Sequence, residues 1–248
     1  MADIWIEKVP VRFGSIDRSD RISLWSIVNF FQEAAISHAA ELGVGREEML
    51  KNGYAWVISR MSLFVERRPV FGETVQVSTW PRGSDKLFAL RDYEIRDAGD
   101  RAVVRGRSAW LIIDVEKRRP LRAQAIVEKL PLNDGKDAFP EGPAALKARE
   151  GLEKCLDRPA LYSDIDYFGH ANNARYIQWI QDVTDIDILT NAAKIKFDIN
   201  YLSEVMPGDT VELRKAALDD AWQGFAYEGR RCGSEQAAFR AELRLNNE

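Results

Sequence analysis

Hydrophobic and polar positions along this chain follow two periods, and the change from one to the other marks its elements. Residues 24–39 carry apolar side chains over most of a helical circumference, which predicts a helix that is buried nearly all round. Ser23 is a typical N-cap, and Gly43 and Gly45 end the helix after Leu42. Runs rich in β-branched and aromatic residues come next and predict antiparallel strands at residues 55–67, 73–80, 88–97 and 101–115.

The same order of elements returns in the second half of the chain. The stretch SIDRSDRISLWSIVNFFQE (15–33) aligns with DIDYFGHANNARYIQWIQD (164–182), and a Gly-acidic-Thr-Val motif occurs at 72–75 and again at 208–211. A second helix is predicted from about Asn172 to Leu189, followed by strands at residues 193–204, 209–220, 222–231 and 236–246. The pattern therefore predicts an α+β, tandem (double) hotdog fold, in which each half is an antiparallel sheet wrapped around a long central helix.

The predicted boundaries are an N-terminal hotdog domain at residues 1–116, a linker at 117–157 and a C-terminal hotdog domain at 158–248. The linker holds four of the nine prolines, which indicates an ordered crossing segment with one or two short helices. Its length lets the second domain pair edge to edge with the first. Because this pairing replaces the one that single-hotdog proteins obtain by dimerising, a monomer and a homodimer are both compatible with the sequence.

Composition narrows the class of protein. Hydrophobic residues make up 46% and charged residues 30%, a balance typical of water-soluble globular chains. The net charge of -4 argues against a nucleic-acid binder, and no apolar run approaches the roughly 18 residues of a membrane span. The N-terminus lacks the apolar core of a signal peptide. Cys155 and Cys232 lie outside any CxxC motif, which favours a reducing compartment. These features predict a cytoplasmic protein without membrane or nucleic-acid partners.

Polar chemistry is concentrated where the second helix begins. One of only two histidines, His170, lies four residues after Asp166 on the loop that enters this helix. A carboxylate and a histidine so placed can activate a water molecule or polarise a carbonyl group. Asp164 can serve in the turn or in the chemistry, and Asn172 is either a further polar group of the site or the helix cap. A metal site is not predicted, because the two histidines lack ligand spacing.

Four stretches together resemble the acyl-acyl-carrier-protein (acyl-ACP) thioesterase family, in its bacterial branch without a transit peptide. They are YAWVISRMSL, RDYEIRDAGDRAVVRGRSAWLIIDVEKRRPLR, YSDIDYFGHANNARYIQWI and INYLSEVMPGDTVEL. The resemblance implies hydrolysis of the thioester between a fatty acyl chain and the phosphopantetheine arm of acyl carrier protein. This reaction ends fatty acid biosynthesis and needs no cofactor.

The family draws its catalytic set from an Asp-x-Asn-x-His pattern and a downstream glutamate. Asp166 and His170 match the pattern, and Glu204 matches the glutamate. Phe168 stands at the asparagine position, and Val205 stands where plant members carry cysteine, which excludes a cysteine nucleophile there. The resemblance implies general-base hydrolysis with Glu204 or Asp166 as the base and His170 as its partner. The N-terminus of the second helix then contributes to the oxyanion hole.

The first copy of the repeat is an internal comparison. Arg21 aligns with His170 and Arg68 with Glu204, while Asp17 keeps the aspartate. The acid–base set therefore occurs once, which predicts a single active site on the second domain.

The resemblance also implies that the first domain supplies the acyl-chain pocket. The candidate residues lie on one strand, where ordinary core packing is the alternative explanation: Trp56, Ile58 and Met61.

Acyl carrier protein is strongly acidic, so the resemblance predicts a local basic docking surface, although a solvated run of charge is the alternative. The candidates lie on the strand RAVVRGRSAW and in the adjoining KRRPLR segment: Arg105, Arg107, Lys117, Arg118 and Arg119.

Two other functions fit the same sequence. An acyl-CoA thioesterase would share the fold and the chemistry. A non-enzymatic acyl-binding protein would share the fold alone, and the absence of the family asparagine at Phe168 keeps this alternative open.

Overall fold

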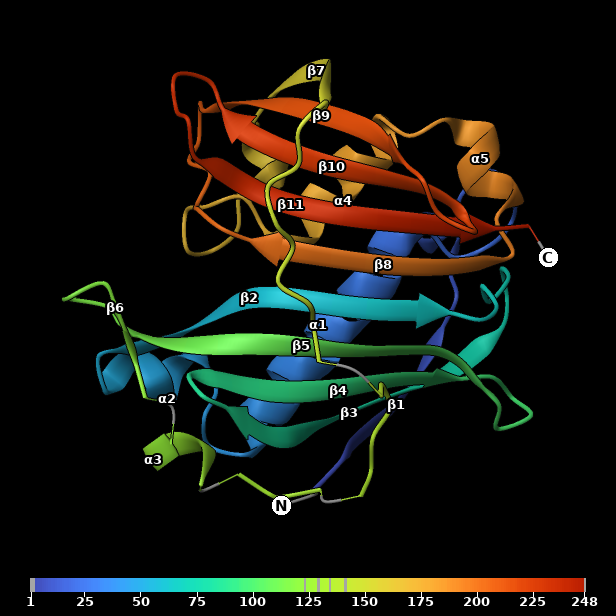
Figure 1. Cartoon of the computed structure of the whole chain (residues 1–248). Helices are drawn as coiled ribbons and strands as arrows, with labels where there is room; N and C mark the ends of the chain where they lie inside the picture. Colours follow the sequence, from blue (N-terminus) through green and yellow to red (C-terminus); the bar gives the residue numbers. More distant parts are fainter. Residues whose placement is uncertain (1–2, 123, 129, 134, 141, 248) are drawn as a thin grey trace.

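The computed structural model describes residues 3–122, 124–128, 130–133, 135–140 and 142–247 (Figure 1). The first half comprises α1 (Leu24–Glu41), α2 (Arg46–Lys51), β1 (Trp5–Pro10), β2 (Tyr54–Val65), β3 (Thr74–Asp85), β4 (Phe88–Arg96), β5 (Ala102–Asp114) and β6 (Arg119–Leu121). The second half comprises α4 (Asn173–Asp182), α5 (Ile186–Asn191), β7 (Glu153–Pro159), β8 (Lys194–Tyr201), β9 (Thr210–Leu218), β10 (Gln223–Arg231) and β11 (Ala237–Asn246). Between them lies α3 (Gln124–Val127).

The strands form one antiparallel sheet in the order β1-β3-β4-β5-β2-β8-β11-β10-β9-β7, with β6 paired to β5. The second five strands repeat the first five in reverse order about the β2–β8 junction. At this junction Ser62 lies opposite Asp198 in register. The alignment of 72–75 with 208–211, extended without a gap, places the same two residues on each other. An approximate twofold axis therefore passes through this pair, as expected for a tandem hotdog fold.

The pair at the junction is itself polar. The Ser62 hydroxyl donates a hydrogen bond to the buried Asp198 carboxylate. Burial raises the pKa of Asp198, and the hydrogen bond from Ser62 partly offsets this effect. The two halves are thus joined by side chains as well as by the backbone ladder.

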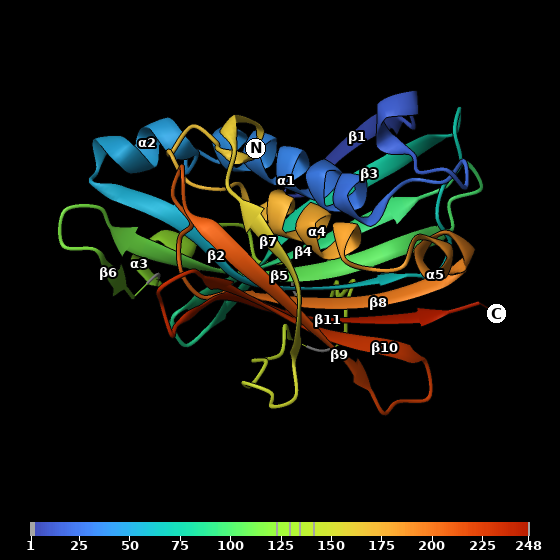
Figure 2. The same ribbon diagram turned by 90° about the horizontal axis from the view of Figure 1, so that it is seen from above.

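Both long helices lie on one face of the sheet, as Figure 2 shows. Ser23 caps α1, and its side chain accepts the N–H of Ser26, as the sequence predicted. Phe31 of α1 stacks on Tyr93 of the sheet, with 4.6 Å between ring centroids. The expectation that α1 is buried nearly all round is wrong on one side, where Ile36 is 55% exposed. The sheet and α4 cover only part of its circumference.

The second predicted helix is two helices. Its N-terminal part, α4, ends at Asp182, and α5 begins at Ile186. The Thr184 hydroxyl donates back to the Ile180 carbonyl at 2.7 Å, while the Asp185 side chain accepts the N–H groups that open α5. The local preference of Asp185 for an N-cap therefore divides a segment that hydrophobic periodicity alone joined.

The linker crosses the sheet on the face opposite the helices (Figures 1 and 2). The Ala138 N–H donates to Asp92 of β4 at 2.9 Å, and the Asn200 amide of β8 donates to the Ala144 carbonyl at 2.9 Å. The last residues of the predicted linker form β7, which pairs with β9 as an edge strand of the second half. Residues 1, 2 and 248, which the predicted domains include, lie outside the described residues.

Candidate active site

The loop that enters α4 is a tight turn closed by its own backbone. The Asp166 N–H donates to the His170 carbonyl at 2.9 Å, and the Gly169 N–H donates to the Asp166 carbonyl at 3.0 Å. Gly169 has φ of 81°, in the left-handed region that glycine tolerates best. An Asp166 carboxylate oxygen accepts the Phe168 N–H at 2.8 Å, so this side chain stabilises the turn.

A second backbone contact brings the downstream glutamate to this turn. The Ala171 N–H donates to the Val205 carbonyl at 2.8 Å and fixes the segment after β8 against the start of α4. As a result His170 Nε2 lies 3.5 Å from Glu204 Oε2. The His170 side chain is 27% exposed and the Glu204 side chain 54% exposed, so water and a substrate can reach the pair.

Two polar residues beside this pair are engaged structurally. The Asn172 side chain caps α4 by accepting the Ala174 N–H at 2.9 Å. Asp164 is buried, where it pairs with Arg158 at 3.1 Å and accepts the Trp179 indole N–H at 3.2 Å. Both residues hold the loop in place. None of these contacts directs the Asp164 carboxylate or the Asn172 amide toward His170.

The N-terminus of α4 lies directly after His170 in the chain. In its first turn, the Ala174 N–H is capped by the Asn172 side chain and the Arg175 N–H donates to the Asn172 carbonyl at 2.8 Å, which leaves the Asn173 N–H without a partner among the described residues. These groups give the helix end a partial positive charge, which favours a negative charge developing nearby.

Tyr176 belongs to the surroundings of this pair, although sequence reasoning did not single it out. Its ring packs against Trp179 and Tyr201, at centroid distances of 5.0 and 5.7 Å. Burial raises the pKa of its phenol, and the negative charges of Glu204 and Asp166 raise it further. Its only signal in the sequence was a place on the buried face of α4, one turn after the cap.

The three candidates for the acyl pocket lie in two parts of the first half. Ile58 and Met61 are buried in the main core between sheet and helices. Trp56 packs in a smaller apolar cluster beside α2, and its indole N–H donates to the Val44 carbonyl at 2.9 Å. Ala39 and Leu42, at the C-terminal end of α1, pack against the same cluster as Trp56.

The first half reaches the candidate active site through α2. The Arg46 guanidinium lies over the ring of Tyr167, 3.9 Å from its centroid. The Phe168 ring meets Tyr167 edge-on at 5.7 Å and is 48% exposed. The residue at the family asparagine position therefore supports Asp166 through its backbone, while its ring points to Tyr167.

The predicted docking cations differ in exposure. Lys117, Arg118 and Arg119 are exposed on the β5–β6 hairpin, which lies at the same end of the molecule as α2 in both views (Figures 1 and 2). Arg105 is partly exposed, 3.7 Å from Glu94. Arg107 is buried instead.

Buried ion pairs account for the position of Arg107. It donates to Asp92 at 2.5 Å and to Asp137 of the linker at 2.7 Å. The linker that covers this part of the sheet therefore takes Arg107 out of reach of a partner protein. The exposed hairpin and the partly exposed Arg105 are what remain of the predicted surface.

The first copy builds a buried ion pair where the second has His170 and Glu204. Arg68 Nη1 lies 2.5 Å from Asp17, and its Nη2 donates to Ser19 and to the Thr190 carbonyl, each at 3.0 Å. The Arg68 side chain is only 2% exposed. Because Thr190 belongs to α5, this arginine ties the first half to the second.

Within the described ranges, no group of three or more His, Cys, Asp or Glu side chains is arranged to hold a metal ion. In the same part of the chain, no helix has the length and apolar character that a membrane crossing requires.

Comparison with known families covers nearly the whole chain. Residues 3–129 match the family model of the acyl-ACP thioesterase N-terminal domain, and residues 152–245 match that of the C-terminal domain. An acyl-[acyl-carrier-protein] hydrolase of Cuphea viscosissima is 25% identical over 90% of this chain and 57% of its own length. A palmitoyl-acyl carrier protein thioesterase of Gossypium hirsutum is 26% identical over 81% of this chain and 52% of its own. The chain thus spans about half the length of the curated relatives it matches.

Solved structures share the fold. An acyl-ACP thioesterase from Bacteroides thetaiotaomicron superposes with a TM-score of 0.88 at 23% identity, covering 98% of each chain. The 12:0-ACP thioesterase from Umbellularia californica gives 0.85 at 21% identity, covering 99% of this chain and 98% of that one. These matches confirm the predicted tandem hotdog fold.

Proposed function

The chain belongs to the acyl-ACP thioesterase family, and from this premise we propose that it hydrolyses acyl-ACP to a free fatty acid and the carrier thiol. The observation that carries the proposal is the His170–Glu204 pair at the start of α4, with 3.5 Å between Nε2 and Oε2. In an unliganded site such a contact is often long and tightens when substrate binds.

Glu204 acts as the general base, with His170 as its partner. Glu204 takes a proton from a water molecule that His170 orients, and the water oxygen attacks the thioester carbonyl carbon. The Asn173 N–H and the positive end of the α4 dipole stabilise the oxyanion that forms. The C–S bond then breaks, and the proton held by Glu204 passes to the departing sulfur. Water is thereby split between the acid and the thiol.

Asp166 is a positioning residue in this scheme. Its carboxylate accepts the Phe168 N–H at 2.8 Å, which holds the turn that presents His170. Glu204 has no such structural hydrogen bond among the described contacts and is more exposed, which favours it over Asp166 as the base.

The acyl chain and the carrier protein are both assigned to the first half. The contact of Arg46 with Tyr167 places α2, and the apolar cluster that contains Trp56, beside the active-site loop. The exposed cations of the β5–β6 hairpin lie at this end too, where they can attract an acidic carrier. Substrate therefore enters between the halves, with its chain directed into the first and its thioester at the second.

Thiol release from one acyl chain on two carriers, acyl carrier protein and coenzyme A, tests the proposal. Wild type is expected to hydrolyse the acyl-ACP faster at equal concentration, and His170→Ala to lose the activity on both carriers. Faster release from acyl-CoA would reassign the carrier. Binding of acyl-ACP without any thiol release would replace hydrolysis by acyl binding.

A further inference from the structure

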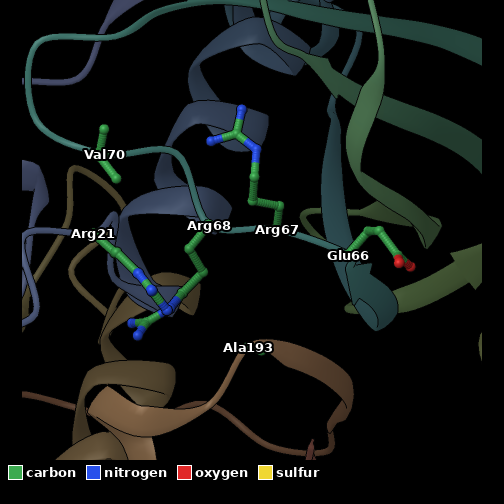
Figure 3. Close-up of a pocket in the computed structure, with 6 residues that line it drawn as sticks. All are labelled: Arg21, Glu66, Arg67, Arg68, Val70 and Ala193. Atoms are coloured by element: carbon green, nitrogen blue, oxygen red, sulfur yellow. The ribbon is translucent and has the colours of Figure 1, made fainter. Parts of the chain in front are cut away.

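A cavity lies in the first copy at the positions that correspond to His170 and Glu204. The cavity has a volume of about 220 Å³ and is lined by Arg21, Glu66, Arg67, Arg68, Val70 and Ala193. Figure 3 shows that Arg21 and Arg68 bring their guanidinium ends together, while Arg67 and Glu66 point away from them. Arg21 and Arg68 are the counterparts of His170 and Glu204. The first copy therefore places two cationic side chains where the second has a histidine and a glutamate.

Most of the charges that line this cavity are neutralised within the protein. Arg67 pairs with Glu73 at 2.7 Å and Glu66 with Lys194 at 3.2 Å. Arg68 pairs with Asp17. Arg21 is the lining charge with no ion pair to any described residue.

Two donors of the lining arginines are also unsatisfied. The Nε–H of Arg68, whose side chain is 2% exposed, is buried without a hydrogen-bond partner, and so is the Nε–H of Arg67. Buried donors are nearly always satisfied in folded proteins, by the chain or by a bound group. The unsatisfied Nε–H of Arg68, beside the unpaired guanidinium of Arg21, thus points to a group that the protein alone does not supply.

Electrostatics agree with this geometry. Burial lowers the pKa of Arg68, and the nearby positive charge of Arg21 lowers it further, whereas Asp17 raises it. Among the described residues, Asp17 pairs with Arg68 alone, so none of them neutralises the positive charge of Arg21. An anion between the two arginines would relieve their repulsion.

We propose that this cavity binds a small oxyanion, a phosphate or carboxylate group, between Arg21 and Arg68. Guanidinium groups present forked donors that fit both anions. The volume is below the range of about 300–1,000 Å³ typical of pockets for drug-sized ligands, which favours a small anion over an acyl chain. The inference does not depend on the proposed catalytic function, because the two sites share no residue.

The bound anion has a structural consequence. Val70 follows β2 in the first half, and Ala193 precedes β8 in the second. An anion in this cavity therefore bridges the two halves at the end opposite the active-site loop and stabilises the folded chain.

Thermal unfolding in a phosphate titration, at ionic strength held constant with chloride, tests the site. Wild type and the charge-matched control Arg12→Ala, which removes an exposed arginine outside the cavity, are expected to gain Tm with phosphate. Arg21→Ala is expected to lose that gain. A parallel titration with acetate distinguishes the source: a gain with acetate assigns a carboxylate ligand, and a gain with phosphate alone assigns a phosphate.

Line broadening of inorganic phosphate in ³¹P NMR gives a readout that does not depend on stability. Broadening by wild type and Arg12→Ala, but not by Arg21→Ala, supports the site. The inference is overturned if Arg21→Ala responds like the control in both measurements, or if neither phosphate nor acetate changes the Tm of the wild type.

Discussion

The two copies of the repeat form the same turn and put different chemistry on it. Asp17 accepts the Ser19 N–H at 2.9 Å, and Asp166 accepts the Phe168 N–H at 2.8 Å, so each aspartate closes its turn in the same way. A role that both copies share cannot explain why only one carries an acid–base pair. The comparison therefore separates a structural aspartate from the side chains beside it.

The residues that face each turn from the end of β2 and β8 differ in burial as well as in charge. Arg68 is 2% exposed and paired with Asp17, whereas Glu204 is 54% exposed beside His170. A buried ion pair in one copy contributes to the fold, and an exposed pair in the other remains available for a substrate. Substitution of Arg68 should therefore lower stability, whereas substitution of Glu204, at the matching position, should lower activity.

Replacement of the proposed base is expected to give the largest effect. Glu204→Gln keeps the shape of the side chain but removes its proton acceptor, so kcat/KM for acyl-ACP should fall by about 10²–10³-fold. The kcat/KM of Asp166→Asn should fall less, because asparagine can still accept the Phe168 N–H. Steady-state thiol release measures both. A greater loss of kcat/KM in Asp166→Asn than in Glu204→Gln would assign the role of base to Asp166 and contradict its purely structural role.

Removal of the first-copy arginine tests the structural side. Arg68→Ala leaves Asp17 without its partner and should lower the free energy of unfolding by about 3–5 kcal/mol. Glu204→Gln, at the matching position, should change it by no more than about 0.5 kcal/mol. Urea unfolding of the two variants measures the contrast, and equal losses would mean that the two positions do not differ in role.

Charge reversal on the first-half hairpin is expected to have a moderate effect. Arg118→Glu combined with Arg119→Glu should raise KM for acyl-ACP several-fold at low salt, because the carrier is acidic, and the difference should shrink as salt screens the charges. Lys147→Glu with Arg149→Glu, an equal change at exposed linker positions, serves as the control. An unchanged KM in the hairpin variant would remove this surface from the docking proposal.

Restoring the family asparagine should have the smallest effect. The Phe168 backbone already supports Asp166, and its ring lies against Tyr167. Phe168→Asn should therefore keep kcat/KM within about twofold of the wild type. A large gain in turnover would show that the side chain at this position limits the reaction.

Local signals in the sequence predicted much of the fold. The cap at Ser23 and the strand pattern depend on near neighbours, and the structure reproduces them. The break before α5 was missed because the cap at Asp185 competes locally with a helical period that continues across it. The exposed side of α1 was missed because exposure depends on where the sheet ends, which the helix itself does not encode.

The geometry of the candidate site was predictable where its residues are close in sequence. Asp166 and His170 share one loop, but the approach of Glu204 depends on the contact between Ala171 and Val205 across the fold. The burial of Arg107 depends in the same way on the linker, which comes after it in the chain. Contacts between distant segments carry no local signal, and these are the features that needed the structure.

A double-mutant cycle on acyl-ACP hydrolysis tests the central claim, that His170 and Glu204 form the single active site. His170→Ala and Glu204→Gln should each lose about a hundredfold or more in kcat/KM. Because the two groups act as one unit, the double variant should lose little more than the worse single variant. Activity in His170→Ala close to that of the wild type, or losses that multiply in the double variant, would contradict the claim.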